Sequence, residues 1–213
     1  MICGVDEAGK GPVMGPMVIA AVSVNNAKLI EKLGFKDSKL LSSKKREELF
    51  ELIKKNYEYA IEIIEPEKID EYRKRNKLNL LNRKAFEKVI SKLNPDIAYV
   101  DAADVNEERF GREIKNNLTN EKNTDVISMH KADTKIPIVA AASIIAKQTR
   151  EIEIEKLKCK IGDFGSGYPS DERTIKFLKS YFHDKAEWPA GTRKSWKTIQ
   201  RIRPVKKLSD YGD

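Results

Sequence analysis

The sequence contains little cysteine and little histidine, which limits the chemistry that it can carry. Cys3 and Cys159 are its two cysteines, and His130 and His183 are its two histidines. Two separated cysteines cannot form a disulfide framework, and no group of Cys and His has the spacing of a zinc site. We therefore expect both cysteines to be buried thiols in a reducing compartment.

Long apolar runs are also absent from the sequence. No stretch approaches the ~20 apolar residues that a membrane helix needs, and the start lacks the basic and apolar regions of a secretory signal. We therefore expect a cytoplasmic protein with no membrane partner. The 213 residues, 40% of them hydrophobic, suffice for one domain with a sizeable core. We expect a main domain over residues 1–190 and a basic helical segment and tail over residues 191–213.

Positive charge is in excess, with a net charge of +8 at pH 7. A basic excess suits a polyanionic partner but serves solubility equally well. The stretch 191–207 is more specific, because it has seven basic residues and no acid, which favours contact with duplex phosphates. Lys39, Lys147 and Arg150 are further candidates, although the last two would also suit a helix surface. The basic residues of the stretch are Arg193, Lys194, Lys197, Arg201, Arg203, Lys206 and Lys207.

The hydrophobic pattern predicts an α/β fold. Two strand-like runs, 1–6 and 17–24, are joined by a short turn and should pair antiparallel. Strands and helices alternate after them, which predicts a mixed sheet with helices packed on it. Further strands are expected at 57–64, 96–101 and 125–129. Helices are expected at 43–55, 78–93, 104–117, 137–158, 171–181 and 195–203, the first capped by Ser42 or Ser43 and the third by Asp104.

The run Gly-Val-Asp-Glu-Ala-Gly-Lys-Gly-Pro at residues 4–12 is the most informative part of the sequence. Asp6 and Glu7 lie side by side at the end of the first strand. Adjacent residues of a strand point to opposite faces, so both acids can serve one site only if the chain bends directly after Asp6. Gly9 and Gly11 allow a sharp bend and a close approach of backbone to a ligand. This combination indicates a metal site on a nucleic-acid enzyme.

Two more acids lie at comparable places. Asp101 ends the fourth strand, where open α/β folds place their sites, and Asp133 lies just before the helix that begins at Pro137. Taken singly, either acid would more often be a cap or turn residue. Asp104 has a sufficient role as a helix cap, with Glu107 at capping-box spacing, so we leave it out of the site.

The acids gain meaning as a set. If they converge, each pair repels by about 4 kcal/mol at ~4 Å and an effective dielectric constant of ~20. Cations or protonation would relieve this repulsion. Hard divalent ions take oxygen ligands, and two of them can activate a water and stabilise the leaving oxygen of a phosphoryl displacement. A site for Mg²⁺ or Mn²⁺ is therefore predicted at Asp6, Glu7, Asp101 and Asp133.

Six segments together resemble ribonuclease HII, and in particular its archaeal branch. They occur in the order typical of that family, and the resemblance runs from residue 1 to about Arg203. The segments are Asp-Glu-Ala-Gly-Lys-Gly-Pro at 6–12, Asp-Ser-Lys at 37–39, Asp-Ala-Ala-Asp at 101–104, Lys-Ala-Asp at 131–133, Ala-Ser-Ile-Ile-Ala-Lys at 142–147 and Gly-Ser-Gly-Tyr-Pro-Ser-Asp at 165–171.

This resemblance implies an RNase H-like fold, with a mixed five-stranded sheet, flanking helices and a small helical C-terminal part. It implies endonucleolytic cleavage of the RNA strand of RNA–DNA hybrids, which leaves 5′-phosphate ends. It also implies incision on the 5′ side of ribonucleotides embedded in duplex DNA, as in ribonucleotide excision repair. The partners would be these nucleic acids, bound by a monomer. The tail at 206–213 shows no clear sliding-clamp motif.

The resemblance also assigns residues. Its Gly-Arg-Gly element corresponds to Gly9-Lys10-Gly11, whose backbone would read the 2′-hydroxyl. Its junction-sensing tyrosine corresponds to Tyr168, which from the sequence alone would be an aromatic ring packed beneath a loop. Lys10 departs from the usual arginine, because lysine keeps the charge and loses the planar fork of donors. The family's metal-binding acids correspond to Asp6, Glu7, Asp101 and Asp133.

Other interpretations stay open from the residues alone. A nuclease of the integrase or resolvase type would use the same acids on DNA and needs no 2′-hydroxyl. A non-catalytic protein that binds hybrids would not need the acids at all. His130 would either lie near the metal ions or hydrogen-bond within a turn, so we do not count it as catalytic.

Overall fold

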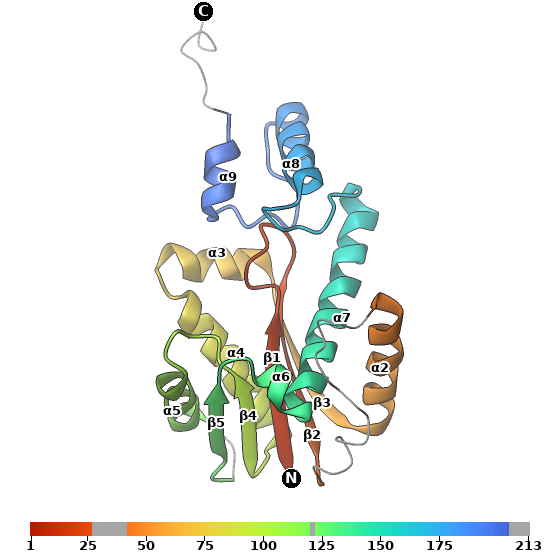
Figure 1. Cartoon of the computed structure of the whole chain (residues 1–213). Helices are drawn as coiled ribbons and strands as arrows, with labels where there is room; N and C mark the ends of the chain where they lie inside the picture. Colours follow the sequence, from red (N-terminus) through yellow and green to blue (C-terminus); the bar gives the residue numbers. More distant parts are fainter. Residues whose placement is uncertain (27–41, 120–121, 205–213) are drawn as a thin grey trace, which may run out of the picture.

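A five-stranded mixed sheet forms the centre of the protein (Figure 1). The computed structural model describes residues 1–26, 42–119 and 122–204, so Lys39 and the tail lie outside the described residues. The strands are β1 (Ile2–Ala8), β2 (Met17–Val24), β3 (Glu58–Ile64), β4 (Ile97–Asp101) and β5 (Asp125–Met129). Their order is β3-β2-β1-β4-β5, in which β1, β4 and β5 are parallel and the β1–β2 and β2–β3 pairs are antiparallel. The predicted mixed five-stranded sheet is confirmed.

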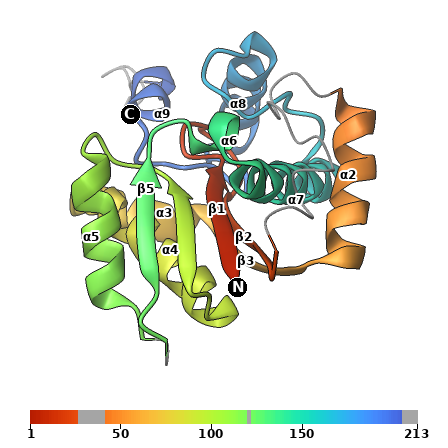
Figure 2. The same ribbon diagram turned by 60° about the horizontal axis from the view of Figure 1, so that its bottom comes forward.

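Helices cover both faces of the sheet, as Figure 2 shows. One face carries α4 (Leu78–Leu93) and α5 (Glu107–Asn117), and the other carries α7 (Pro137–Ile161) and α2 (Ser43–Asn56). The other helices are α3 (Pro66–Lys74), α6 (Ala132–Lys135), α8 (Glu172–Lys185) and α9 (Lys197–Ile202). The predicted helices all form with ends shifted by a few residues, whereas α3 and α6 were not foreseen. None of the described helices is both long and apolar enough to span a membrane.

One of the predicted helix caps is wrong. The Ser42 hydroxyl caps α2 as expected. In contrast, α5 is capped by Asn106, whose side-chain oxygen accepts the N–H of Arg109 at 2.8 Å. Asp104 lies in the preceding turn, where its carboxylate accepts the N–H of Asn106 at 3.2 Å and the Arg109 guanidinium at 2.6 Å. It therefore shapes the approach to α5 without capping it.

The two cysteines differ in exposure. Cys3 lies in the core on β1, and burial raises the pKa of its thiol. Cys159 is exposed near the end of α7, so the prediction that both thiols are buried is wrong for this residue. Its turn of α7 lies past Ile154, the last residue of the helix that is buried.

The first half of α7 packs directly on β1 and β2. Ala140, Ala141 and Ala142 are buried there, and their small side chains let the helix approach the sheet closely. Gly4 does the same from the sheet side, because a Cβ at this position would overlap the carbonyl of Ile138 and lie 2.5 Å from the Val139 nitrogen. This contact fixes the position of α7, and of α6 before it, relative to β1.

The C-terminal part packs on the turn that joins β1 to β2. The Val13 N–H donates to the Gly167 carbonyl at 2.8 Å, and the Gly15 N–H donates to the Gly191 carbonyl at 2.8 Å. Trp196 is buried in the same hydrophobic cluster as the side chains on the α4 face of the sheet. The chain after residue 190 thus shares the main core, and the predicted boundary there stays a prediction.

Replacing Gly4 by alanine should destabilise the protein strongly. The added methyl group meets backbone atoms of α7, which cannot move aside as a flexible side chain can, so we expect a loss of about 3 kcal/mol or more in the free energy of unfolding. Urea unfolding of Gly4→Ala measures it. Gly11→Ala is the control, because a Cβ at Gly11 has only an ordinary contact of 3.8 Å to Tyr168. Equal unfolding midpoints for Gly4→Ala and the unchanged protein would contradict this account of the packing.

Candidate active site at the carboxyl end of the sheet

The pairing of β1 with β4 ends before the carboxyl end of β1. They pair from Ile2 with Ile97 to Val5 with Val100, whereas β1 continues to Ala8 in its ladder with β2. Beyond Val5, therefore, β1 has a strand neighbour on one side only. Open α/β sheets bind their ligands outside the carboxyl ends of the strands, so a site is expected at this end of β1 and β4.

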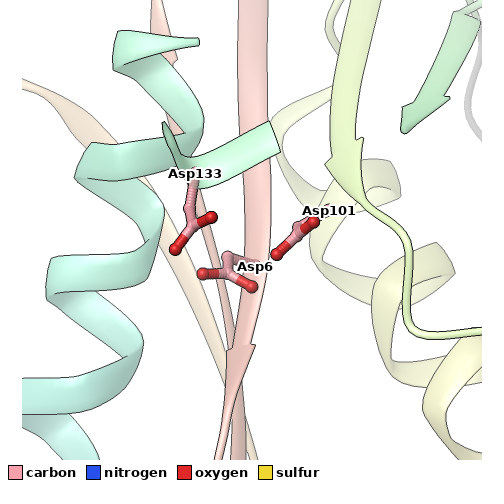
Figure 3. A group of neighbouring side chains, drawn as sticks. All are labelled: Asp6, Asp101 and Asp133. Atoms are coloured by element: carbon pink, nitrogen blue, oxygen red, sulfur yellow. The ribbon is translucent and has the colours of Figure 1, made fainter. Parts of the chain in front are cut away.

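Three of the predicted acids converge at this end of the sheet (Figure 3). Asp6 comes from β1, Asp101 from the end of β4 and Asp133 from the short helix α6. One carboxylate oxygen from each lies within 4.8 Å of the other two. Asp6 is 5% exposed and Asp133 is 4% exposed, while Asp101 is half-buried. The structure therefore brings together three carboxylates that the sequence separates by up to 127 positions.

Hydrogen bonds hold these carboxylates in place. The Glu7 N–H donates to Asp6 at 2.7 Å, and the Ser143 hydroxyl of α7 also hydrogen-bonds Asp6. The N–H of Ala132, at the start of α6, donates to Asp101 at 3.0 Å. The donors stabilise the negative charge and fix where it points. Ser143 lies in the segment 142–147, but no local pattern predicts this role.

The pKa of Asp6 shows how costly the arrangement is. This pKa is raised to about 8, mainly by burial and also by the nearby charges of Asp101 and Asp133, against the hydrogen bonds from Ser143 and the Glu7 N–H that lower it. A divalent cation would remove this cost, because it favours the ionised carboxylates. The donor set is oxygen only, which suits hard ions such as Mg²⁺ or Mn²⁺. These three residues therefore fit a metal site.

Glu7 lies beside the cluster but not in it. β1 does not bend after Asp6, as the sequence analysis required, but continues to Ala8. Glu7 consequently points to the opposite face, toward α4. There the Asn82 amide donates to its carboxylate, and the Lys10 ammonium lies 3.9 Å from it. Burial raises the pKa of Glu7, and the charge of Asp101 raises it as well, so the charge of Glu7 interacts with a carboxylate of the cluster. The completely buried Asn82 had no sequence signal.

The glycine turn begins at Gly9, which takes a φ of +86°. It is held from beneath by Arg193, whose guanidinium donates to the carbonyls of Gly9 (2.6 Å), Lys10 (3.0 Å) and Gly15 (3.0 Å). Arg193 is 0% exposed. The expectation that this arginine contacts phosphate is thus not met. Its donors are used to shape the turn, through contacts nearly 180 positions apart in sequence that no local pattern reveals.

The turn carries two further contacts. The Lys10 ammonium donates to the carbonyl of Ala103, which ties the turn to the loop after β4. The Trp196 indole N–H donates to the Gly11 carbonyl at 3.1 Å. Tyr168 lies next to Gly11 and is 40% exposed, so one part of its ring packs on the protein and another is open to solvent.

The remaining predicted residues, Lys147, Lys194 and His130, have different surroundings. Lys147 is half-buried on α7, one turn after Ser143 and therefore on the same side of the helix. Lys194 is exposed, while its backbone N–H donates to Asp70 at 2.7 Å. The backbone N–H of His130 donates to the Glu107 carboxylate at 2.6 Å, and its ring Nε2 lies 3.2 Å from the Val105 carbonyl, so His130 contacts the start of α5 and not its own turn.

Comparison with known proteins agrees with this geometry. The sequence model of the family Ribonuclease HII matches residues 3–199. The chain belongs to the ribonuclease HII family. The ribonuclease HII of Methanoregula boonei is 47% identical over 209 residues, which cover 98% of this chain and 97% of that protein. The family makes the chain a ribonuclease H, an endonuclease of class EC 3.1.26.4.

Solved ribonuclease HII structures show the same fold. The protein from Archaeoglobus fulgidus, solved in complex with PCNA, has a TM-score of 0.88 at 46% identity and covers 99% of this chain and 100% of its own. The ribonuclease H2 from Pyrococcus horikoshii has a TM-score of 0.87 at 43% identity and covers 94% and 96%. The predicted RNase H-like fold and the archaeal resemblance are both confirmed.

Stability of the metal-free ribonuclease should fall as pH rises toward 8. The pKa of Asp6 is raised to about 8 in the folded state, so the contribution of its protonated form is complete below the unfolded value and is lost as pH rises through 8. Thermal unfolding in EDTA, measured from pH 4.5 to 8.5, should show a steeper fall for the unchanged protein than for Asp6→Asn. Mg²⁺ at pH 8 should restore stability only in the former. Parallel pH curves for the two proteins would contradict the assignment.

Proposed function

We propose that this ribonuclease H cleaves the RNA strand of RNA–DNA hybrids and incises duplex DNA on the 5′ side of embedded ribonucleotides. One observation carries the proposal. The cluster of Asp6, Asp101 and Asp133 lies at the carboxyl end of β1. The turn from Gly9 to Gly11 follows the same strand end, and Tyr168 lies beside Gly11. A reaction centre thus adjoins a surface of backbone groups and an aromatic ring that suits a ribose.

The acids would bind divalent ions, Mg²⁺ or Mn²⁺, and we assign Glu7 as the fourth acid because its charge interacts with Asp101. Two such ions would activate a water and stabilise the leaving 3′ oxygen of the scissile phosphodiester. Ser143 and the backbone of α6 would hold the carboxylates of Asp6 and Asp101 in position for the ions. Asn82 and Lys10 hold Glu7 on the other face of β1.

Recognition of the ribonucleotide is assigned to the turn. RNA differs from DNA by the 2′-hydroxyl, which both donates and accepts hydrogen bonds. Arg193 uses its donors on the turn's carbonyls, which fixes the orientation of the peptide groups that would meet this hydroxyl. Tyr168 would place its ring against the sugar at the junction from RNA to DNA. Lys10 would act through its charge and through its hydrogen bond to the Ala103 carbonyl. An arginine at this position would instead offer a planar fork of five N–H donors.

Basic side chains would hold the duplex. Lys147 follows Ser143 by one turn of α7 and shares its side of the helix, from where it would contact a phosphate near the acids. Lys194 is exposed on the C-terminal segment and would contact the backbone farther along. Binding through such contacts weakens steeply with salt.

Three duplexes test the proposal: an RNA–DNA hybrid, a DNA duplex with one ribonucleotide and an all-DNA duplex, each with Mg²⁺ or Mn²⁺. We expect cleavage of the first two only. Asp6→Asn and Asp101→Asn should lower the rate by roughly a thousandfold, because stabilisation of transition-state charge by metal ions is worth several kcal/mol, while binding of the hybrid persists. Asp125→Asn is the matched control, since Asp125 is exposed at the opposite end of the sheet and pairs with Lys115.

Each contrary result has a distinct meaning. Comparable cleavage of all-DNA would favour a nuclease that does not read the 2′-hydroxyl. Hybrid cleavage without incision at the single ribonucleotide would remove the finer part of the proposal. Full activity of both asparagine variants would remove the proposed site.

A further inference from the structure

Arg150 is a buried arginine that the chemistry described so far does not use. It projects from α7 beneath the glycine turn and is 7% exposed. Its Nε and Nη2 atoms are buried and find no acceptor among the described residues. A buried N–H group without a partner costs stability, and a buried charge without one costs more. Such a cost at this place points to a function.

The surroundings of Arg150 are the parts that would read a ribonucleotide. Its guanidinium lies 5.3 Å from the centre of the Tyr168 ring, within the range of a cation–π contact. A Cβ on Gly9 would lie 2.6 Å from the Cδ and Nε of Arg150, so the arginine also supports the turn. Arg150 thus contacts both Gly9 and Tyr168.

A second buried guanidinium lies close by. Burial lowers the pKa of Arg193, and the positive charge of Arg150 lowers it further. Three carbonyls accept from Arg193. Arg150 instead has the face of Tyr168 and the charge of Glu151 as favourable interactions, while its Nε and Nη2 lack an acceptor among the described residues. An anion placed above the turn would relieve the repulsion between the two guanidiniums.

We propose that Arg150 is a positioning residue that holds Tyr168 against the glycine turn and whose buried, incompletely hydrogen-bonded guanidinium is balanced by a phosphate of the bound nucleic acid. The inference rests on the proposed function. It makes Arg150 and Tyr168 one unit in the recognition of an embedded ribonucleotide, with stability of the free protein lowered in favour of substrate binding.

A double-mutant cycle tests the proposal. Arg150→Met keeps much of the volume and removes the charge. We expect it to lower kcat/KM on the single-ribonucleotide duplex by about tenfold, the order of a desolvated cation–π contact, mainly through KM. In a Tyr168→Ala background the same change should have little further effect, because the two residues act together. Arg150→Lys should retain part of the activity, since it keeps the charge and loses the planar group.

Thermal unfolding is the second readout. Arg150→Met removes a buried charge that has two donors without an acceptor among the described residues. The unfolding midpoint of the free protein should therefore stay unchanged or rise. A residue with a purely structural role would show the opposite. Lys156→Met on the same helix is the control, because Lys156 is exposed and pairs with Glu153, and neither readout should change.

The outcomes separate this inference from the proposed function. A lowered midpoint or a failure to fold in Arg150→Met would overturn it, as would losses that simply multiply in the double variant. Incision by Arg150→Met at the rate of the unchanged protein would also overturn it while leaving the proposed function intact. If the unchanged protein itself does not incise the single-ribonucleotide duplex, the proposed function fails first.

Discussion

Repulsion between three neighbouring carboxylates, two buried and one half-buried, is the constraint on which the rest of this structure depends. Asp6, Asp101 and Asp133 lie within 4.8 Å of one another, and burial raises the pKa of Asp6 to about 8. Such a cluster persists only where surrounding packing and hydrogen bonds enforce it. The backbone of α6, the Ser143 hydroxyl and the close contact of α7 with Gly4 provide that enforcement.

Buried charges of the same sign are also held together beneath the glycine turn, but there the charges are positive. Two guanidiniums are buried beneath the turn that adjoins the acids, Arg193 with its carbonyl partners and Arg150 against Tyr168. The carboxylates suit cations and the turn suits anions. Metal ions would balance the carboxylates, and the phosphodiester that they bind would balance the guanidiniums. The charges of the site would therefore be better compensated with substrate bound than in the free protein.

Much of the fold and part of the site could be predicted from the sequence. Strand ends and helix starts placed Asp6, Asp101 and Asp133 correctly, because local patterns determine where elements end. The bend expected directly after Asp6 does not form, because the ladder with β2 continues to Ala8 and keeps the alternation of faces, so the role of Glu7 stays a proposal. Arg193 was misjudged because its partners lie at the other end of the chain. Long-range contacts between buried polar groups have no local signal. Asn82 showed none, and Arg150, named from its charge as a phosphate contact or a surface residue of a helix, showed no sign of its burial.

The most direct test of the central claim is anomalous diffraction from crystals soaked in Mn²⁺. The account predicts a strong peak among the carboxylates of Asp6, Asp101 and Asp133, and its loss in Asp6→Asn crystals soaked in the same way. Peaks elsewhere on the protein with none among these three residues would contradict it.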